Sequence, residues 1–174
     1  MSASPSRNRT IGFALAALVL ALDLLTKAIV IGPLGLDRDG EQIVLTGFFN
    51  LTRTSNFGVS MGLLTASTDL TRWLLVAMTG AIALVVLVWM LREKKLTDIV
   101  PLGLVLGGAL GNIRDRAVYG HVIDFADFHL GDWHFYIFNL ADAAISIGVL
   151  IILARSFLSG EKHPDKAAAA ATEN

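Results

Sequence analysis

The chain has 174 residues, of which 54% are hydrophobic and 17% are charged, and its formal net charge is −1. A charged share this far below the ~25% of average soluble proteins, together with a mean hydropathy of +0.63, indicates one domain embedded in a membrane. The balanced charge provides no basic surplus for binding nucleic acid, and the absence of cysteine excludes disulfides, thiol nucleophiles and cysteine metal ligands.

The N-terminal region is interpreted as a polar tail followed by a first transmembrane helix. Residues 1–10 are polar and contain two arginines, so we expect a cytoplasmic tail there. The apolar pattern from 11 to 31 is about 21 residues long, close to the ~20 that span a bilayer. A cleaved signal peptide is the alternative, because positive charge precedes the apolar run. No A-x-A-like site follows the run, and Asp23 and Lys27 interrupt its end, which favours a retained helix.

Asp23 and Lys27 are four residues apart, so they share one face of this helix, with the acid before the base. One interpretation is that the pair lines a functional site. The other is that the two charges neutralise each other near the outer interface, with Lys27 extending towards water.

The next region, 32–70, is expected to lie on the outer face of the membrane. Glycine, proline and charged residues break the hydrophobic pattern at its start. The stretch 41–54 is rich in β-branched and aromatic residues and predicts two short strands joined near Gly47, which would form a small sheet. The run 55–58, SNFG, is typical of a turn in which Asn56 bonds to the backbone.

Three further hydrophobic segments predict transmembrane helices, at about 72–91, 98–118 and 138–155. Trp73 and Trp89 fall near opposite ends of the second helix, as aromatic belts do at membrane interfaces. In the third helix, Gly103, Gly107 and Gly111 recur every four residues, a spacing that allows helix backbones to approach closely in a bilayer.

The remaining segments are too polar to span. Residues 119–137 are broken by glycine, histidine and aspartate but contain aromatic residues, so we expect an interfacial segment on the outer face. Residues 159–174 are charged and then alanine-rich, and we expect a disordered cytoplasmic tail. The fold class predicted for residues 11–158 is therefore an all-α membrane protein: four transmembrane helices with a small extramembrane β-sheet and an interfacial segment.

Four helices place both termini on the same side of the membrane. Eight of the 14 basic residues lie on the side of the termini and six on the other side, so the positive-inside rule predicts cytoplasmic termini. The polar stretch 111–142 is then expected at the outer leaflet.

This polar stretch contains two carboxylates that suggest chemistry. Asp124 follows the third helix and Asp142 lies about one turn into the fourth, so they come from separate segments that can face each other. When two carboxylates lie close together, one stays ionised as a base towards water, while the other keeps its proton and polarises a carbonyl. Asp124 and Asp142 are therefore predicted to form a coupled dyad of the aspartic-protease type.

A purely structural interpretation stays open. In it, Asp142 pairs with Arg116, Asp124 is a turn residue, and the polar face of the third helix is a buried ion-pair network. Asp127 and Asp132 are expected to be solvated loop acids under either interpretation.

Other chemistries fit the sequence less well. Metal ligand types occur close together at His121, Asp124, His129 and His134, but no two of these histidines have the i, i+4 spacing of a helical zinc pair and no H-E-x-x-H is present. Serine catalysis on a G-x-S-x-G elbow is also excluded. We therefore expect neither a metal nor another cofactor.

Two non-peptidase functions remain as alternatives. A small transporter or channel subunit would use Asp23, Lys27, Arg116 and Asp142 as an ion or proton relay. A structural assembly factor would tolerate replacement of both carboxylates of the dyad. A relay requires polar groups through the inner half of the bundle, whereas the charges gather in the outer half.

Five sequence blocks resemble those of the lipoprotein signal peptidase family, also called signal peptidase II. In chain order they are DLLTK (23–27), SNFG (55–58), GNIRDR (111–116), VIDF (122–125) and FNLAD (138–142). Their order and spacing agree with the family over roughly residues 11–155. One departure follows SNFG, where Val59, Ser60 and Met61 stand in place of small residues and then phenylalanine.

The resemblance implies an aspartic endopeptidase of the bacterial inner membrane that removes the signal peptide of a prolipoprotein on the amino side of its diacylglyceryl-modified cysteine. Asp124 and Asp142 match the catalytic aspartates of the family. The other motif positions, which are expected to support the dyad or bind substrate, are Asp23, Lys27, Asn56, Gly58, Asn112, Arg116, Asn139 and Ala141. The resemblance also implies membrane lipids as partners, inhibition by globomycin and no metal.

The predicted sheet is a candidate surface for the mature side of the cut, which could bind to it as an extended strand. Its apolar side chains Ile43, Leu45 and Phe48 are the expected contacts.

Overall fold

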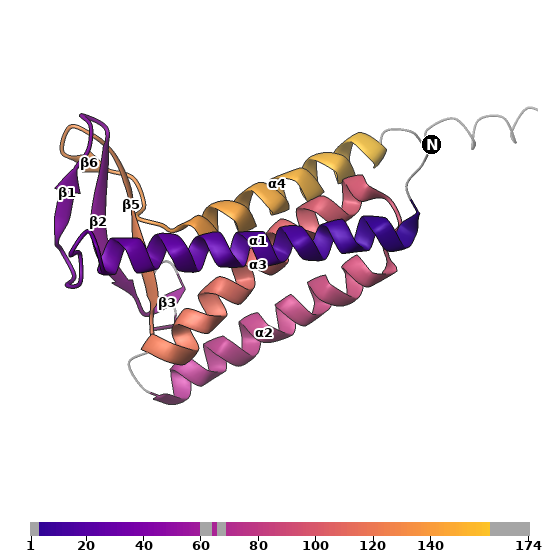
Figure 1. Ribbon diagram of the computed structural model, residues 1–174, viewed down its shortest axis with the longest axis horizontal. Helices are drawn as coiled ribbons and strands as arrows, with labels where there is room; N and C mark the ends of the chain where they lie inside the picture. The colour runs from indigo at the N-terminus through magenta and orange to yellow at the C-terminus, as the bar shows by residue number, and fades with distance from the viewer. Residues whose placement is uncertain (1–3, 60–63, 66–68, 161–174) are drawn as a thin grey trace, which may run out of the picture.

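The computed structural model describes residues 4–59, 64–65 and 69–160, and within them the chain forms a helical bundle with a small sheet at one end (Figure 1). The helices are α1 (Pro5–Ile31), α2 (Asp69–Arg92), α3 (Leu96–Tyr119) and α4 (Leu140–Gly160). Each is long and apolar enough to cross a membrane. The end of the bundle that carries the sheet is called the sheet end below, and the opposite end, where α1 begins and α4 ends, the terminal end.

The sheet has four antiparallel strands in the order β1-β2-β5-β6. These are β1 (Gln42–Val44), β2 (Phe49–Asn56), β5 (Val122–Leu130) and β6 (Trp133–His134), and a separate ribbon pairs β3 (Gly58–Val59) with β4 (Leu64–Thr65). The predicted fold class is confirmed, with four long apolar helices and a small sheet. The segment 119–137, expected to be interfacial, supplies two strands of this sheet because β5 pairs with β2.

The two largest differences from the expected helix boundaries are at the start of α1 and at the end of α4. Helix α1 begins at Pro5, inside the expected tail 1–10, because the Ser4 side chain accepts a hydrogen bond from the backbone N–H of Arg7 and proline suits the first helical turn. Helix α4 continues to Gly160, past its expected end at Arg155, whose guanidinium pairs with Asp98 of α3 at 2.8 Å. The expected disordered tail lies outside the described residues from 161 onwards, as does the family departure at Ser60 and Met61.

Helix α3 is the centre of the bundle, since α1, α2 and α4 all pack mainly on it. Its glycines make this possible. A Cβ added at Gly107 would lie 2.5 Å from the backbone oxygen of Ala16 in α1, and one at Gly108 would collide with the backbone oxygen of Ala141 in α4. The four-residue glycine spacing therefore serves backbone contact, as predicted from the sequence.

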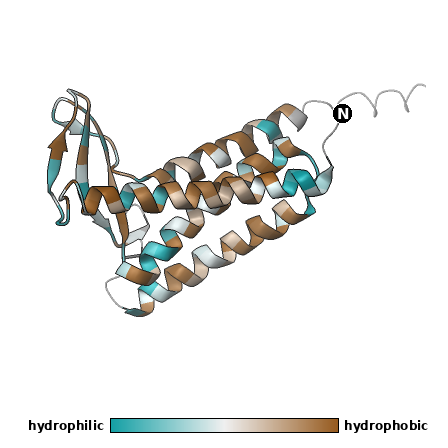
Figure 2. Ribbon diagram, in the orientation of Figure 1, coloured by the Kyte–Doolittle hydropathy of each residue, from teal (hydrophilic) through white to brown (hydrophobic). Residues whose placement is uncertain are grey.

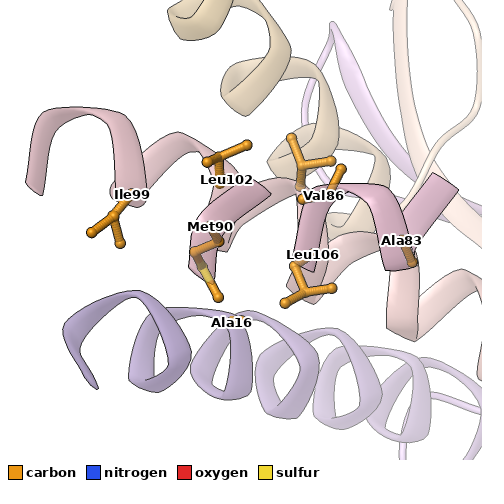
Figure 3. Close-up of a cluster of buried hydrophobic side chains, with 8 residues drawn as sticks. Ala16, Ala83, Val86, Met90, Ile99, Leu102 and Leu106 are labelled. Carbon is orange, nitrogen blue, oxygen red and sulfur yellow. The ribbon is translucent and has the colours of Figure 1, made fainter. Parts of the chain in front are cut away.

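The terminal half of the bundle has an apolar core. Figure 3 shows side chains of α2 and α3 meeting above Ala16 of α1, and the cluster consists of Ala16, Ala83, Val86, Met90, Ile99, Leu102, Val105 and Leu106. Figure 2 shows hydrophobic residues along the middle of the helices and hydrophilic residues near the ends of the bundle. Most buried charges consequently lie at the sheet end, beyond this core.

Replacing Gly107 with alanine should destabilise the bundle by about 1–3 kcal/mol, because its new Cβ meets rigid backbone of α1. Gly80→Ala in α2 is the matched control, since a Cβ there meets no atom within 4 Å. Thermal unfolding of both variants in detergent measures the difference. Equal unfolding temperatures would contradict close packing at Gly107.

Candidate active site

The two carboxylates singled out from the sequence lie on different elements at the sheet end. Asp124 is on β5 and is 1% exposed, whereas Asp142 is in the first turn of α4 and is half-buried. The charge of Asp142 is near enough to act on the carboxyl of Asp124. The tertiary structure thus brings the two acids into one site.

Two asparagine side chains connect these carboxylates. Nδ2 of Asn139 donates to Oδ1 of Asp124 at 2.6 Å and also to Oδ1 of Asn112 at 3.2 Å. Nδ2 of Asn112 in turn donates to Oδ1 of Asp142 at 2.8 Å. The amides therefore form a continuous chain of hydrogen bonds from one acid to the other.

Local sequence places Asp142 at this point. Asn139 stands directly before α4, and its Oδ1 accepts a hydrogen bond from the backbone N–H of Asp142 at 3.0 Å. The carboxylate of Asp142 accepts reciprocally from the backbone N–H of Asn139 at 3.4 Å. This arrangement resembles a capping box, so the N-x-x-D spacing both starts the helix and orients the acid.

The environment of Asp124 changes its acidity. Burial raises the pKa of Asp124 to about 7, and the negative charge of Asp142 adds to the rise. Hydrogen bonds donated by Asn56, at 3.0 Å, and by Asn139 oppose it. Asp124 is therefore suited to hold or release a proton near neutral pH, as catalytic acids and bases require.

A buried lysine lies next to the amide chain. The ammonium of Lys27, 2% exposed, is 2.7 Å from a carboxylate oxygen of Asp23 and 2.7 Å from one of Asp115, both in fully buried side chains. It also donates to Oδ1 of Asn112 at 3.5 Å. The pair Asp23–Lys27 therefore faces the site and does not extend to water, in contrast to the second interpretation of the sequence.

Asp23 also explains the position of Ala141. Oδ1 of Asp23 accepts a hydrogen bond from the backbone N–H of Ala141 at 3.0 Å. Ala141 is fully buried, and a Cβ at Gly111 would contact both the Asp23 carboxylate and the Ala141 side chain. A side chain at position 111 would therefore collide with Asp23 where α1, α3 and α4 meet.

Asp115 is a residue of this network that the expected site set lacks. One of its oxygens accepts from Lys27, and the same oxygen accepts from the backbone N–H of Ile123 at 3.4 Å, one residue before Asp124. Arg114 lies 3.3 Å from its other oxygen. In the sequence, Asp115 could be noticed because it is three residues after Asn112 and so shares a helix face with it. The contact between Asp115 and β5 is visible only in the tertiary structure.

Arg116, Asn56 and Gly58 border the site on its open side. The guanidinium of Arg116 donates to the backbone oxygen of Gly58 at 3.4 Å, and the N–H of Gly58 donates to Oδ1 of Asn56 at 3.1 Å. Oδ1 of Asp142 accepts from Asn112, and no Asp142–Arg116 ion pair is found among the residues that the structure describes, in contrast to the structural alternative.

A cavity of about 640 Å³ opens beside Asp142. Its lining is apolar except near the acid and is formed by Asn56, Gly58, Arg116, Phe135, Tyr136, Phe138, Asp142, Ala143, Ile145, Ser146 and Ile147. Nδ2 of Asn56 donates to the hydroxyl of Tyr136 at 3.1 Å, which connects β2 to the segment before α4 within the cavity lining. An apolar chain with one reactive polar bond fits such a cavity.

Asp127 corrects one expectation from the sequence. It is fully buried on β5 and not a solvated loop acid, because Thr52 donates to it at 2.7 Å and Nδ1 of His134 lies 2.8 Å away. Although burial opposes the change, these two hydrogen bonds lower the pKa of Asp127. Asp132 is exposed, as expected.

Two of the three histidines considered as metal ligands have other side-chain partners. His134 binds Asp127, and Nε2 of His121 lies 3.1 Å from the guanidinium of Arg53. Burial lowers the pKa of His121, and the charge of Arg53 lowers it further. Among the residues that the structure describes, no group of three or more His, Asp or Glu side chains is placed to hold a metal ion.

The sheet residues proposed as substrate contacts divide into two kinds. Leu45 and Phe48 are exposed, at 51% and 59%. Ile43 is instead half-buried and packs against a small core that contains Val30, Leu36 and Phe125. A polar substitution of Ile43 would therefore act on the fold.

Comparisons with known proteins agree with this architecture. The sequence model of the family described as "Signal peptidase (SPase) II" matches residues 15–158. The lipoprotein signal peptidase of Rhizorhabdus wittichii is 52% identical over 162 residues, which cover 92% of this chain and 94% of the relative. That of Sphingopyxis alaskensis is 52% identical over 163 residues, covering 93% and 94%.

Two solved structures are also similar. One, described as a bacterial membrane enzyme determined by the in meso method at 2.3 Å resolution, has a TM-score of 0.75 and 26% identity, covering 90% of this chain and 93% of that one. A second, described in the same way at 1.9 Å, has a TM-score of 0.72 and 29% identity, covering 84% and 92%.

The raised pKa of Asp124 predicts a pH-dependent stability. Because the folded protein holds a proton that the unfolded chain releases above pH ~4, this residue's contribution should fall as the pH rises from about 4 to about 7. Asp124→Asn cannot titrate, so its unfolding temperature relative to wild type should increase between pH 5 and pH 8, on the order of 5 °C.

His121 acts in the opposite direction, since its lowered pKa favours the folded state as the pH rises. The quantity to compare is therefore the difference in unfolding temperature between Asp124→Asn and wild type at each pH, because the contribution of His121 is the same in both proteins and cancels. A difference that stays constant with pH would show that Asp124 has an ordinary pKa.

Proposed function

Because this chain belongs to the signal peptidase II family, we propose that it is a membrane aspartic endopeptidase that cleaves prolipoproteins on the amino side of the diacylglyceryl-modified cysteine. Family membership itself supports the removal of signal peptides from prolipoproteins, and hence a protease of lipoprotein processing. The observation that carries the aspartic mechanism is the pair Asp124 and Asp142, connected through Asn112 and Asn139.

In the proposed reaction the dyad shares one proton. The ionised carboxylate takes a proton from water as the water oxygen attacks the scissile carbonyl, and the protonated carboxyl donates to the carbonyl oxygen. Collapse of the tetrahedral intermediate returns a proton to the leaving amine. The pKa of about 7 at Asp124 is consistent with sharing a proton near neutral pH, but the two acids act as a coupled pair.

The surrounding residues are proposed to hold the dyad in one geometry. An ammonium can only donate, so the contact with Lys27 turns Oδ1 of Asn112 towards the cation and leaves Nδ2 for Asp142. Asp23 and Asp115 fix the ammonium from two sides. Asn56, Gly58 and Arg116 line the cavity and are proposed to contact the substrate backbone.

The family and the four apolar helices indicate a multi-pass bacterial membrane protein. We place the termini in the cytoplasm and the dyad at the outer leaflet of the inner membrane, because basic residues are more numerous on the terminal side. A lipid-anchored precursor presents its scissile bond at that level, and globomycin is the expected inhibitor. Membrane lipids surround the apolar helix faces.

The distribution of buried charges argues against the transporter alternative. Asp23, Lys27 and Asp115 are buried at the sheet end, next to the dyad. Between them and the terminal end lies the apolar cluster around Met90 and Leu102. A relay across the membrane would need polar groups through that layer.

Cleavage of a purified diacylated precursor in detergent tests the proposal. Asp124→Asn and Asp142→Asn should each lower kcat by about 100-fold or more, because an amide cannot transfer the proton. Asp132→Asn, at an exposed turn, is the matched control and should retain activity. Substantial cleavage by either dyad variant would reject the mechanism, and chelator should leave wild-type activity unchanged.

The proposed positioning role of Asp115 has its own test. Asp115→Asn should lower kcat about tenfold with little change in KM, because the ammonium and the strand that carries Asp124 lose one anchor. Asp37→Asn, an exposed acid, serves as control. A change confined to KM would instead assign Asp115 to substrate binding.

A further inference from the structure

A row of polar side chains crosses the four-stranded sheet, from the strand at one edge to the strand at the other. Nε2 of Gln42 in β1 donates to Oγ1 of Thr52 in β2 at 2.9 Å. That hydroxyl donates to Oδ2 of Asp127 in β5 at 2.7 Å, and Nδ1 of His134 in β6 lies 2.8 Å from Oδ1 of the same carboxylate. These four side chains, called the polar ladder here, follow the strand order β1-β2-β5-β6.

The carboxylate of Asp127 is the buried centre of the polar ladder. Its side chain is fully buried, whereas that of His134 is 45% exposed. Although burial opposes the change, the hydrogen bonds from Thr52 and His134 lower the pKa of Asp127, which is therefore ionised near neutral pH. Because an ionised carboxylate can only accept, Nδ1 of His134 carries the proton. Removing this donor would leave a buried charge with one hydrogen bond fewer, which is costly.

The ring of His134 has a second neighbour across the β5–β6 hairpin. His129 lies directly opposite it in the strand pairing, and the two imidazole rings stack with their centroids 5.3 Å apart. Nδ1 of His129 lies 3.3 Å from the backbone oxygen of Gly131 in the turn, outside the polar ladder. The two histidines thus share a ring contact, but His134 alone of the two bonds to Asp127 in the structure described.

His134 directly precedes one wall of the active-site cavity. After β6 the chain runs back to the start of α4 (Figure 1), whose first turn carries one acid of the dyad. The residues on this path, 135–138, are called the wall segment here, and three of them line the cavity: Phe135, Tyr136 and Phe138. The wall segment therefore connects the edge of the sheet to the catalytic end of α4.

Backbone hydrogen bonds attach both ends of the wall segment to β5. The N–H of Phe135 donates to the backbone oxygen of Phe128 at 2.8 Å, and that of Phe138 donates to the backbone oxygen of Ala126 at 3.1 Å. Phe135 and Tyr136 are 59% and 46% exposed, so burial contributes little to holding the segment in place. Its position consequently depends on its attachments to β5, and the polar ladder adds one that ends on a buried charge.

We propose that His134 is a positioning residue for substrate binding, whose hydrogen bond to Asp127 holds the wall segment where it forms the active-site cavity. This inference rests on the proposed function and adds to it two residues outside the hydrogen-bonded network of the dyad. Without this bond the wall segment leaves its place for part of the time, and KM rises by the inverse of the fraction of enzyme with a formed cavity. The chemical step is unchanged in the molecules that bind substrate.

Steady-state cleavage of a diacylated precursor tests this role. His134→Phe keeps a ring beside His129 but removes the donor, so KM should rise about tenfold with kcat retained, because a charge-assisted hydrogen bond is lost. His134→Asn restores a donor, since its Nδ2 occupies the place of Nδ1, and should return KM to the wild-type value. His129→Phe is the matched control, because it makes the same replacement on the opposite strand, and it should leave KM unchanged.

Hydrogen–deuterium exchange of the free enzyme is a second readout, which does not depend on cleavage. The amides of Phe135 and Phe138 should exchange about tenfold faster in His134→Phe than in wild type, and at the wild-type rate in His134→Asn. A rise in KM without faster exchange would overturn the proposal and indicate that His134 contacts the substrate directly. A fall in kcat with unchanged KM would also overturn it.

His134→Ala provides a second variant if His134→Phe does not fold, and the exposed position of this side chain favours folding. It should raise KM and amide exchange in the same way. His129→Ala removes the same ring contact and is its control, which should behave like wild type. Equal effects of these two alanine variants would assign the effect to ring stacking and reject the role of the hydrogen bond.

These outcomes are separate from failure of the proposed function. If the wild-type enzyme does not cleave the precursor, the peptidase assignment is lost, and the exchange measurement still decides whether His134 holds the wall segment. If the wild-type enzyme cleaves it and His134→Phe matches His129→Phe in both KM and exchange, the peptidase assignment stands and only the role of His134 is rejected.

Discussion

The ammonium of Lys27, held between two buried carboxylates, is the interaction on which the sheet end of the bundle depends. Burying one charge in an apolar environment is expensive, and a buried pair is stable only when its remaining hydrogen-bonding capacity is satisfied. Here Asp23 and Asp115 supply the opposite charge, and Asn112 supplies a further acceptor. The partners come from α1 and α3, so the cation fixes these two helices relative to each other.

The same interaction extends into the site through backbone groups. Asp23 accepts from the N–H of Ala141 in α4, and Asp115 accepts from the N–H of Ile123 in β5. Each of these residues is a direct sequence neighbour of one acid of the dyad. The two anchors of the lysine are therefore also anchors of the elements that carry Asp124 and Asp142, and this relation connects the stability of the bundle to the geometry of the site.

The geometry of the site also depends on close packing of the helices. The glycines of α3 allow the backbones of α1 and α4 to approach so closely that side chains as short as those of Asp23 and Asn112 reach across. The active-site cavity opens beside this close contact, between Arg116 of α3, the first two turns of α4 and the end of β2. Rigid backbone contacts thus hold the acids at the edge of a space that is available to a substrate.

The sequence alone determined the features that depend on local pattern. Hydrophobic segment length identified the four helices, the glycine spacing identified α3 as a packing helix, and the blocks VIDF and FNLAD identified the acids, since each is a signal contained within a few residues. Only the tertiary structure decided that β5 joins β2, that Asp127 is buried and that Asp115 holds Lys27. Those contacts join residues that are far apart in the chain. A hydrogen bond or ion pair between two distant segments changes neither the hydrophobic periodicity nor the composition of either segment, so the sequence pattern does not indicate it.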